Sequence, residues 1–225
     1  MNENLCVSIN GRNPLDCMDM ISSCDAEIIE HRMDYMDQIE QLHEIYDATS
    51  KPIIATCRPS AFGGYFNGHE EERTNYLIEA LSAGASYVDI EMQATELLFD
   101  SVKSEALERG SRIILSKHYW NSTPSESVLK KNVADIQQMK PDIIKIVTTA
   151  TSVEDCLRVL HLYHPNTRPE IPLIAFAMGR IGKFTRVCSL FLGAPFGYVS
   201  HDSGKAAAAG QIPQSTMRLV LEVLG

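Results

Sequence analysis

Lys145 stands where a lysine is unexpected. It lies in the run Ile143 to Val147, whose other residues are apolar and β-branched, as in a strand that is buried on both faces. Lysine is rarely buried without compensation, and an ammonium in an apolar environment favours its neutral form, whose lone pair can attack a carbonyl carbon. Lys145 is therefore a candidate for Schiff-base chemistry. The alternative is a lysine whose stem packs in the strand while its ammonium reaches solvent or pairs with a carboxylate.

Two other places hold groups that could serve the same chemistry. His118 follows the apolar run 112–116 and precedes the chain's only tryptophan by two residues. Its imidazole could act as a general acid or base, or it could be a hydrogen-bonded structural histidine. Glu30, Arg32 and Asp34 alternate along an extended segment and should point to one side. They could orient a histidine or hold a hydroxylated ligand, or they could form a local ion pair.

Further polar residues follow other apolar runs. Arg58 comes shortly before Gly63 and Gly64, which indicate a flexible lid, although a solvated loop arginine is the default interpretation. Arg186 ends a segment whose glycines could let the backbone approach a ligand, and its guanidinium could bind a carboxylate with two hydrogen bonds. Gln211 offers a neutral hydrogen-bonding side chain near the C-terminus.

The elements that must position these residues can be read from the apolar pattern. Short apolar runs, with centres roughly 20 to 35 residues apart, leave room for a helix between successive strands. These candidate strands are 5–9, 26–30, 52–56, 87–91, 112–116, 143–147, 173–177 and 196–200. The clearest intervening helices are 70–83, 95–109, 125–139 and 152–163. We therefore predict an α/β protein with one compact domain over 1–225, a (β/α)8 TIM barrel, whose active site lies at the C-terminal ends of the strands.

One helix allows a detailed prediction of its buried face. In the segment 95–109 we expect the buried face to consist of Leu97, Leu98, Val102 and Leu107.

Composition narrows the class of protein. Hydrophobic residues make up 44% of the chain and charged residues 22%, and the formal net charge is −9. These values argue against nucleic-acid and anionic-membrane partners but allow a small anionic substrate beside local arginines. The six cysteines form no C-x-x-C pair, so we expect no disulfide and no zinc or other metal. The N-terminus does not look like a signal peptide and no window suits a membrane span, so we expect a cytoplasmic protein.

Together these positions resemble the type I 3-dehydroquinate dehydratases, the Schiff-base dehydroquinases of the shikimate pathway of aromatic amino-acid biosynthesis. The resemblance runs from Ser8 to Gln211 in the order of the family. It rests on E-x-R-x-D at Glu30–Asp34, Thr-Cys-Arg at Thr56–Arg58 before Gly63-Gly64, S-x-H at Ser116–His118, K-I-V at Lys145–Val147, M-G-x-x-G-x-x-T-R at Met178–Arg186, and G-Q at Gly210–Gln211.

The resemblance implies roles for the catalytic residues. Lys145 would form an imine with the C3 ketone of 3-dehydroquinate, with no metal or organic cofactor. His118 would remove the C2 proton and assist formation and hydrolysis of the imine. Glu30 would lie near that histidine and the substrate hydroxyls.

The resemblance also implies the substrate contacts and the assembly. Arg32 and Arg58 would line the substrate site, Arg186 would bind the substrate carboxylate, and Ser8 and Gln211 would supply further polar contacts. A homodimer is the expected assembly.

The chain departs from the family pattern at two positions. Phe62 stands where the family often has an acidic residue, and Ala207 where it often has a serine. We expect weaker lid contacts with intact chemistry, which would be contradicted if Phe62→Glu or Ala207→Ser accelerated the chemical step itself.

Two other functions remain open at this point. A Schiff-base lyase of the class I aldolase type would bind a phosphate with the glycine-rich segments near the end of the chain. A catalytically silent barrel could serve as a binding module, although the presence of both Lys145 and His118 argues against it.

Overall fold

The computed structural model describes residues 4–203, 207–208 and 210–224. Within these residues, eight strands alternate with helices in the predicted order. The strands are β1 (Leu5–Ile9), β2 (Ile28–Arg32), β3 (Ile53–Thr56), β4 (Tyr87–Glu91), β5 (Arg112–His118), β6 (Ile143–Thr149), β7 (Leu173–Met178) and β8 (Gly197–Ser200). The remaining residues of the predicted 1–225 domain, 1–3, 204–206, 209 and 225, lie outside the described part.

The helices occupy the connections between strands. The α-helices are α1 (Pro14–Ser22), α2 (Leu42–Asp47), α3 (Glu70–Ser82), α4 (Glu96–Arg109), α5 (Glu126–Gln138), α6 (Val153–Leu160), α7 (Gly179–Phe191) and α8 (Gln214–Leu224). Short 3-10 turns follow as η1 (Met33–Tyr35), η2 (Ser60–Phe62) and η3 (His161–Tyr163). The start of α6 is fixed by a reciprocal cap, in which Ser152 and Asp155 each accept a hydrogen bond from the other's backbone N–H.

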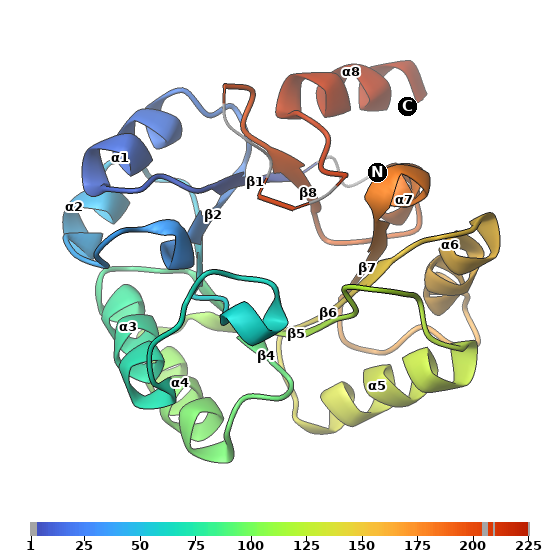
Figure 1. Cartoon of the computed structure of the whole chain (residues 1–225), viewed down its shortest axis with the longest axis horizontal. Coiled ribbons are helices and arrows are strands. Elements are labelled where there is room, and N and C mark those ends of the chain that lie inside the picture. Colours follow the sequence, from blue (N-terminus) through green and yellow to red (C-terminus); the bar gives the residue numbers. More distant parts are fainter. Residues whose placement is uncertain (1–3, 204–206, 209, 225) are drawn as a thin grey trace.

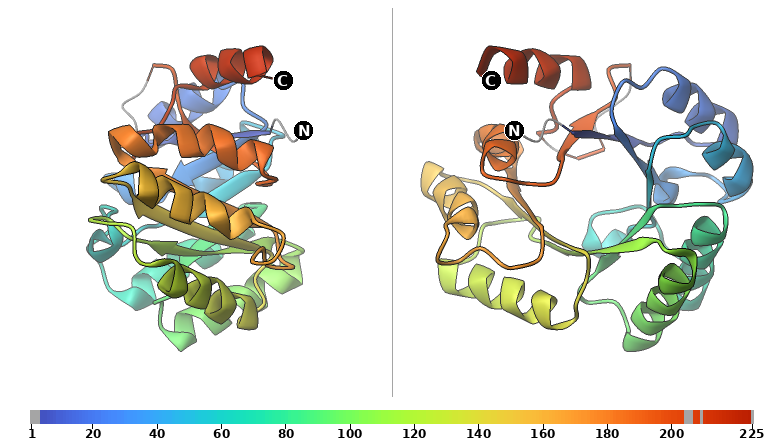
Figure 2. Two further views of the ribbon diagram at one scale, coloured as in Figure 1. Left: turned by 90° about the vertical axis from the view of Figure 1, so that its right-hand side faces the viewer. Right: turned by 180° about the vertical axis from the view of Figure 1, so that it is seen from behind.

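The strands form one parallel sheet in the order β7-β6-β5-β4-β3-β2-β1-β8. Pairing of β8 with β1 brings the two ends of the sheet round toward each other, and the helices form an outer ring (Figures 1 and 2). The predicted (β/α)8 TIM barrel is therefore confirmed. Because all strands are parallel, their C-terminal ends share one rim, where this fold places its active sites.

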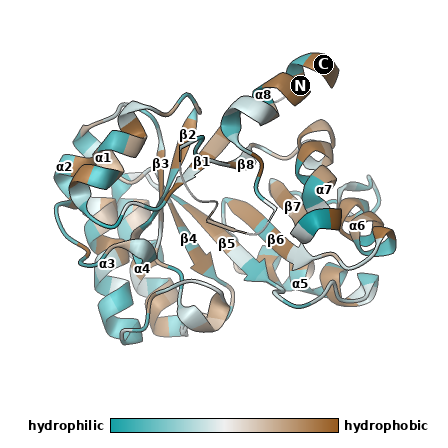
Figure 3. Ribbon diagram, turned by 45° about the horizontal axis from the view of Figure 1, so that its top comes forward, coloured by the Kyte–Doolittle hydropathy of each residue, from teal (hydrophilic) through white to brown (hydrophobic). Residues whose placement is uncertain are grey.

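Apolar side chains pack in two layers. The larger cluster fills the space between the sheet and the helices, whereas a smaller one fills the barrel. Figure 3 shows mostly hydrophobic strands inside helices that mix hydrophobic and hydrophilic residues. Along β2, Ile28 belongs to the inner cluster, and Glu30 and Arg32 follow at the same phase toward the rim. Along this strand the barrel interior is thus apolar at the N-terminal end and polar at the C-terminal end.

The predicted buried face of α4 is partly wrong. Leu98 and Val102 are buried as expected, together with Ala106 one turn further on. Leu97 and Leu107, however, are 79% and 81% exposed. The stripe at i, i+4 and i+8 faces the barrel, and both leucines point away from it because they fall outside that stripe.

Two further features bear on the expected class of protein. In the described part of the chain, no helix is long and apolar enough to cross a membrane. All six cysteines have free thiols.

Candidate active site

The C-terminal rim of the barrel surrounds a cavity. All of the predicted site residues except Ser8 line it. The lining consists of Glu30, Arg32, Arg58, His118, Trp120, Lys145, Val147, Phe176, Met178, Arg186, Tyr198, Ala208 and Gln211.

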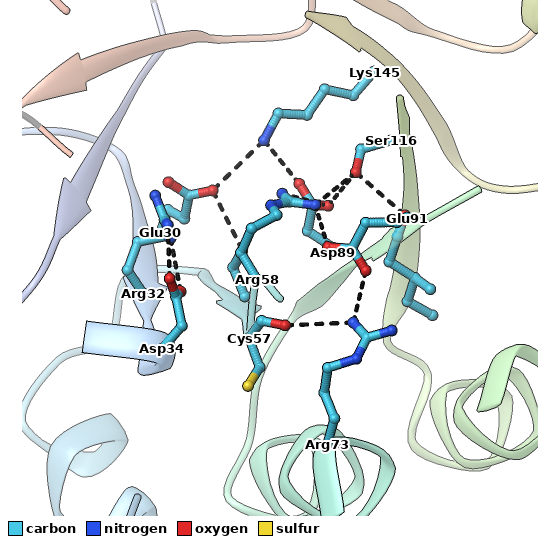
Figure 4. Close-up of polar contacts among 12 residues, drawn as sticks. Glu30, Arg32, Asp34, Cys57, Arg58, Arg73, Asp89, Glu91, Ser116 and Lys145 are labelled. Atoms are coloured by element: carbon cyan, nitrogen blue, oxygen red, sulfur yellow. Dashed lines mark hydrogen bonds and ion pairs between the residues drawn. The ribbon is translucent and has the colours of Figure 1, made fainter. Parts of the chain in front are cut away.

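Lys145 lies inside the barrel on β6 and is only 4% exposed. Its Nζ donates a hydrogen bond to Asp89 Oδ2 at 2.7 Å and lies 3.5 Å from Glu30 Oε1 (Figure 4). The centroid of the Tyr198 ring is 3.9 Å from the same nitrogen. The expected apolar environment is therefore wrong. Two carboxylates and an aromatic face compensate the buried charge, as the alternative interpretation of this lysine allowed.

Glu30 is held on β2 by a chain of hydrogen bonds. Gln211 Nε2 donates to Ser8 Oγ at 3.1 Å, and Ser8 Oγ donates to Glu30 Oε2 at 2.6 Å. Thr56 Oγ1 donates to the other carboxylate oxygen at 3.3 Å. Ser8 therefore reaches the site through Glu30, whereas Gln211 lines the cavity itself.

Arg58 is the centre of a buried ion-pair network (Figure 4). Its guanidinium pairs with Asp89 at 2.9 Å and with Glu91, and it donates to Ser116 Oγ at 3.0 Å. Glu91 also pairs with Arg73 of α3 at 2.6 Å. Arg58 thus lines the cavity and also cross-links β3, β4 and β5 at the rim.

Sequence analysis missed the two carboxylates of this network. Asp89 and Glu91 are both buried, on the strand that was predicted at 87–91. Their spacing of two residues near a strand end was the available signal, the same one that found Glu30 and Arg32. Although burial opposes ionisation, the charges of Arg58 and then Lys145 hold the pKa of Asp89 well below its usual range.

Arg32 and Asp34 form the local ion pair that was one interpretation of their motif. Arg32 lines the cavity and donates two hydrogen bonds to Asp34, at 2.9 and 2.8 Å. Asp34 also accepts from the backbone N–H of Tyr65 at 3.1 Å and so links η1 to the loop after η2. His31, between Glu30 and Arg32, points the other way and lies 3.3 Å from the hydroxyl of Tyr46.

His118 is the last residue of β5 and stacks on Trp120. The two ring centroids are 5.5 Å apart and the rings are 8° from parallel. Nδ1 of His118 is buried and has no hydrogen-bond partner among the described residues. Burial, reinforced by the charges of Arg58 and Lys145, lowers the pKa of His118 well below its usual range. The imidazole is therefore neutral at pH 7 and free to accept a proton.

Arg186 of α7 is 2% exposed but lacks a counterion among the described residues. Its guanidinium carbon lies 4.1 Å from the centroid of the Phe176 ring, and its Nε and Nη2 have no hydrogen-bond partner. Burial lowers the pKa of Arg186 to about 9. A buried guanidinium without a partner is costly, so this position is suited to an anion supplied by a ligand.

The glycines near these arginines have packing roles. A Cβ on Gly182 would lie 2.5 Å from the carbonyl oxygen of Ala177, so this glycine lets α7 pack on β7. A Cβ on Gly63 would lie 2.2 Å from the Trp120 indole, and one on Gly64 would lie 1.9 Å from the Arg58 carbonyl oxygen. The expected ligand approach is therefore wrong for Gly182, and the loop after η2 packs directly against the cavity wall.

The two departures from the family pattern both lie near the cavity. Phe62 is half-buried at the end of η2, next to Gly63. Ala207 is half-buried too, and its carbonyl oxygen accepts a hydrogen bond from the Tyr35 hydroxyl at 3.1 Å. Ala207 therefore ties the segment after β8 to η1 without using a side chain.

This chain is similar in sequence and in fold to known proteins. A chain of 3-dehydroquinate dehydratase from Desulfotalea psychrophila is 37% identical over 193 residues, 86% of this chain and 85% of that one. The enzyme of the same name from Dehalococcoides mccartyi is 37% identical over 195 residues, 85% and 83% of the two chains. The crystal structure of 3-dehydroquinate dehydratase from Geobacillus kaustophilus has the same fold, with a TM-score of 0.89, 24% identity, and coverage of 99% and 91%. The model of the type I 3-dehydroquinase family matches residues 5–225, and this chain belongs to that family.

Proposed function

We propose that this chain dehydrates 3-dehydroquinate to 3-dehydroshikimate, a step of the shikimate pathway, through an imine on Lys145. One observation carries the proposal. A single cavity is lined by a buried lysine, by a histidine whose Nδ1 has no hydrogen-bond partner among the described residues, and by an arginine that has no carboxylate partner among them. These are the groups that a β-hydroxy ketone with a carboxylate would need for binding and elimination.

Arg186 is assigned to the substrate carboxylate. A carboxylate would satisfy Nε and Nη2 and would restore a counterion to the buried guanidinium. Arg32, Glu30 and Gln211 also line the cavity and offer donors and acceptors to the ring hydroxyls.

Imine formation begins at Lys145. The amine lone pair adds to the C3 ketone, the carbonyl oxygen gains protons and leaves as water, and the nitrogen lone pair forms the C=N bond. Glu30, at 3.5 Å from Nζ, is positioned to take up the proton that the ammonium must release first.

The protonated imine then makes the C2 proton acidic. His118, as a neutral base, takes that proton while the electrons of the C–H bond form an enamine. The enamine expels the C1 hydroxyl, which receives a proton from His118 and leaves as water. Hydrolysis of the conjugated imine then frees Lys145. The iminium serves as the electron sink, so the proposal assigns no metal or organic cofactor.

The proposal includes a homodimer. Exposed apolar side chains on the neighbouring helices α6 and α7 support it: Val153, Leu157, Ile181 and Phe184, between 40% and 58% exposed. Leu157→Glu should shift sedimentation toward a monomer, and an unchanged profile would count against this face. We also propose that the protein acts in the cytoplasm, where six free thiols are the expected state.

A direct assay tests the activity. Addition of the wild-type protein to 3-dehydroquinate should produce the ultraviolet absorbance of a conjugated enone, whereas Lys145→Ala should produce none. Free phosphate should leave the rate unchanged, unlike in a phosphate-binding aldolase. A folded wild-type protein that forms no product would refute the proposal.

A further inference from the structure

Tyr198 contacts the nitrogen at which the covalent chemistry would begin. It lies on β8, is 3% exposed and lines the cavity. The face of its ring is turned to Lys145 Nζ, 3.9 Å from the ring centroid. Phe196 and Phe176 hold the ring, at centroid distances of 5.4 and 6.3 Å. Packing therefore fixes the ring where a cation can lie over its face.

The charge on this nitrogen survives the covalent step, but its hydrogen bonds do not. An ammonium and a ketone give a protonated imine and one water, so one positive charge remains on the nitrogen. The ammonium has three N–H donors, whereas the protonated imine has one. Asp89 and Glu30 both lie near the ammonium, and at most one of them can keep a hydrogen bond to the imine. Attraction by an aromatic face needs only the charge, and it is stronger for a cation that has fewer competing polar contacts.

We propose that Tyr198 is a catalytic residue that stabilises the protonated imine on Lys145 with the face of its ring. The inference rests on the proposed function, since it concerns the intermediate of that reaction. Tyr198 replaces part of the stabilisation that the nitrogen loses when two N–H donors disappear.

The effect of the Tyr198 ring can be measured separately from that of its hydroxyl. The hydroxyl is buried and has no hydrogen-bond partner among the described residues. Burial and the charge of Glu30 raise the pKa of Tyr198 well above its usual range, so the hydroxyl stays neutral. Tyr198→Phe consequently breaks no hydrogen bond within the protein and keeps the ring, whereas Tyr198→Leu removes the aromatic face.

The test compares the rate of imine formation with the affinity for a ligand that cannot form an imine. Imine is trapped with borohydride at short times and measured by intact mass. The second ligand is the analogue of 3-dehydroquinate with a hydroxyl at C3, measured by calorimetry. Tyr198→Leu should slow trapping about tenfold to thirtyfold and change the analogue's affinity less than about threefold. Tyr198→Phe should restore trapping to within about threefold of wild type.

A matched control removes a tyrosine hydroxyl elsewhere in the barrel. Tyr87, on β4, contacts Arg112 and does not line the cavity, so Tyr87→Phe should trap imine like the wild type. If Tyr198→Leu does not fold, Tyr198→Met carries the same test.

Three outcomes would overturn the inference. Tyr198→Leu could trap imine as fast as the wild type, or Tyr198→Phe and Tyr198→Leu could slow trapping equally. In the third, Tyr198→Leu would lose as much affinity for the analogue as it loses in the rate of trapping. Absence of any adduct in the wild type would instead refute the proposed function.

Discussion

The two sides of the barrel rim differ in how their polar groups are satisfied. On the side formed by β2 to β4, the arginines lie in ion pairs within the protein, Arg32 with Asp34 and Arg58 with Asp89 and Glu91. On the side formed by β5 to β8 and α7, four side chains keep buried polar atoms without a partner among the described residues: His118, Trp120, Arg186 and Tyr198.

The difference separates two uses of buried polarity. A buried polar group without a partner costs free energy, whereas a paired one is compensated. The arginines of the β2–β4 side are therefore paired before a ligand arrives, and their ion pairs should contribute to stability. The side from β5 to α7 is completed by a ligand and should contribute to catalysis and binding.

The largest expected effect is on the unpaired side. His118→Ala should lower kcat by about 10² to 10⁴ because it removes the general base, with little change in the free energy of unfolding. Steady-state kinetics and urea unfolding measure the two quantities. His43→Ala, on the exposed surface of α2, is the matched control and should leave kcat unchanged. A loss of kcat below tenfold would contradict the assignment.

On the paired side the effect should fall on stability. Glu91→Gln should lower the free energy of unfolding by about 3 kcal/mol, because Arg58 and Arg73 lose a buried counterion. Urea unfolding measures this loss. Glu105→Gln removes a surface pair with Arg109 and should cost less than about 1 kcal/mol. Equal costs for the two variants would contradict a contribution of the buried ion pairs to stability.

Arg186→Met should move activity and stability in opposite directions. Loss of the charged hydrogen bonds to the substrate carboxylate should lower kcat/KM by about tenfold to a hundredfold, mainly through KM. Removal of an unpaired buried guanidinium should leave the protein equally or more stable. Arg180→Met, on the exposed face of the same helix, is the control. A clear loss of stability in Arg186→Met would mean that the guanidinium already has a partner.

The pH dependence of stability tests whether the buried histidines are neutral in the folded chain. Burial lowers the pKa of His118 well below its usual range and that of His31, outside the cavity, to about 4. Below about 6.5, therefore, the unfolded chain binds protons that the folded chain does not. The free energy of unfolding should fall as pH falls from about 6.5 toward 4, by up to about 1.4 kcal/mol per pH unit for each histidine. Asp89, with its depressed pKa, should lose its contribution only below about 4.

Urea unfolding at pH 7, 5.5 and 4.5 measures this slope. His118→Ala should reduce the slope by the contribution of one histidine. A wild-type stability that does not change between pH 6.5 and 4.5 would contradict a buried neutral His118.

The residues that sequence analysis found share one property. Lys145 and His118 are polar residues in or just after apolar runs, and Arg186 ends the glycine-containing segment that follows such a run. The parallel barrel then carries all three to one rim. Asp89 and Glu91 carry the same pattern and were overlooked because their strand was considered only for its apolar content. Their pairing with arginines could not be predicted, because it depends on strand register across β3, β4 and β5.

Other errors came from local rules that packing overrides. In α4, four apolar residues suggested one buried face. Leu97 and Leu107 are exposed to solvent, however, because only the narrower stripe through Leu98 and Val102 packs against the barrel. Gly182 suggested a ligand approach, whereas the close contact is between α7 and β7. In both cases the sequence identifies the elements, and the three-dimensional neighbours decide the use of each residue.

The most direct test of the account is intact-mass spectrometry after incubation with 3-dehydroquinate and borohydride. We expect a mass gain of one reduced ligand, located to Lys145, in the wild type and in Lys117→Ala, which changes a lysine that does not line the cavity. Lys145→Ala should show no gain. A folded wild-type protein that leaves the substrate intact and carries no adduct would contradict the covalent mechanism.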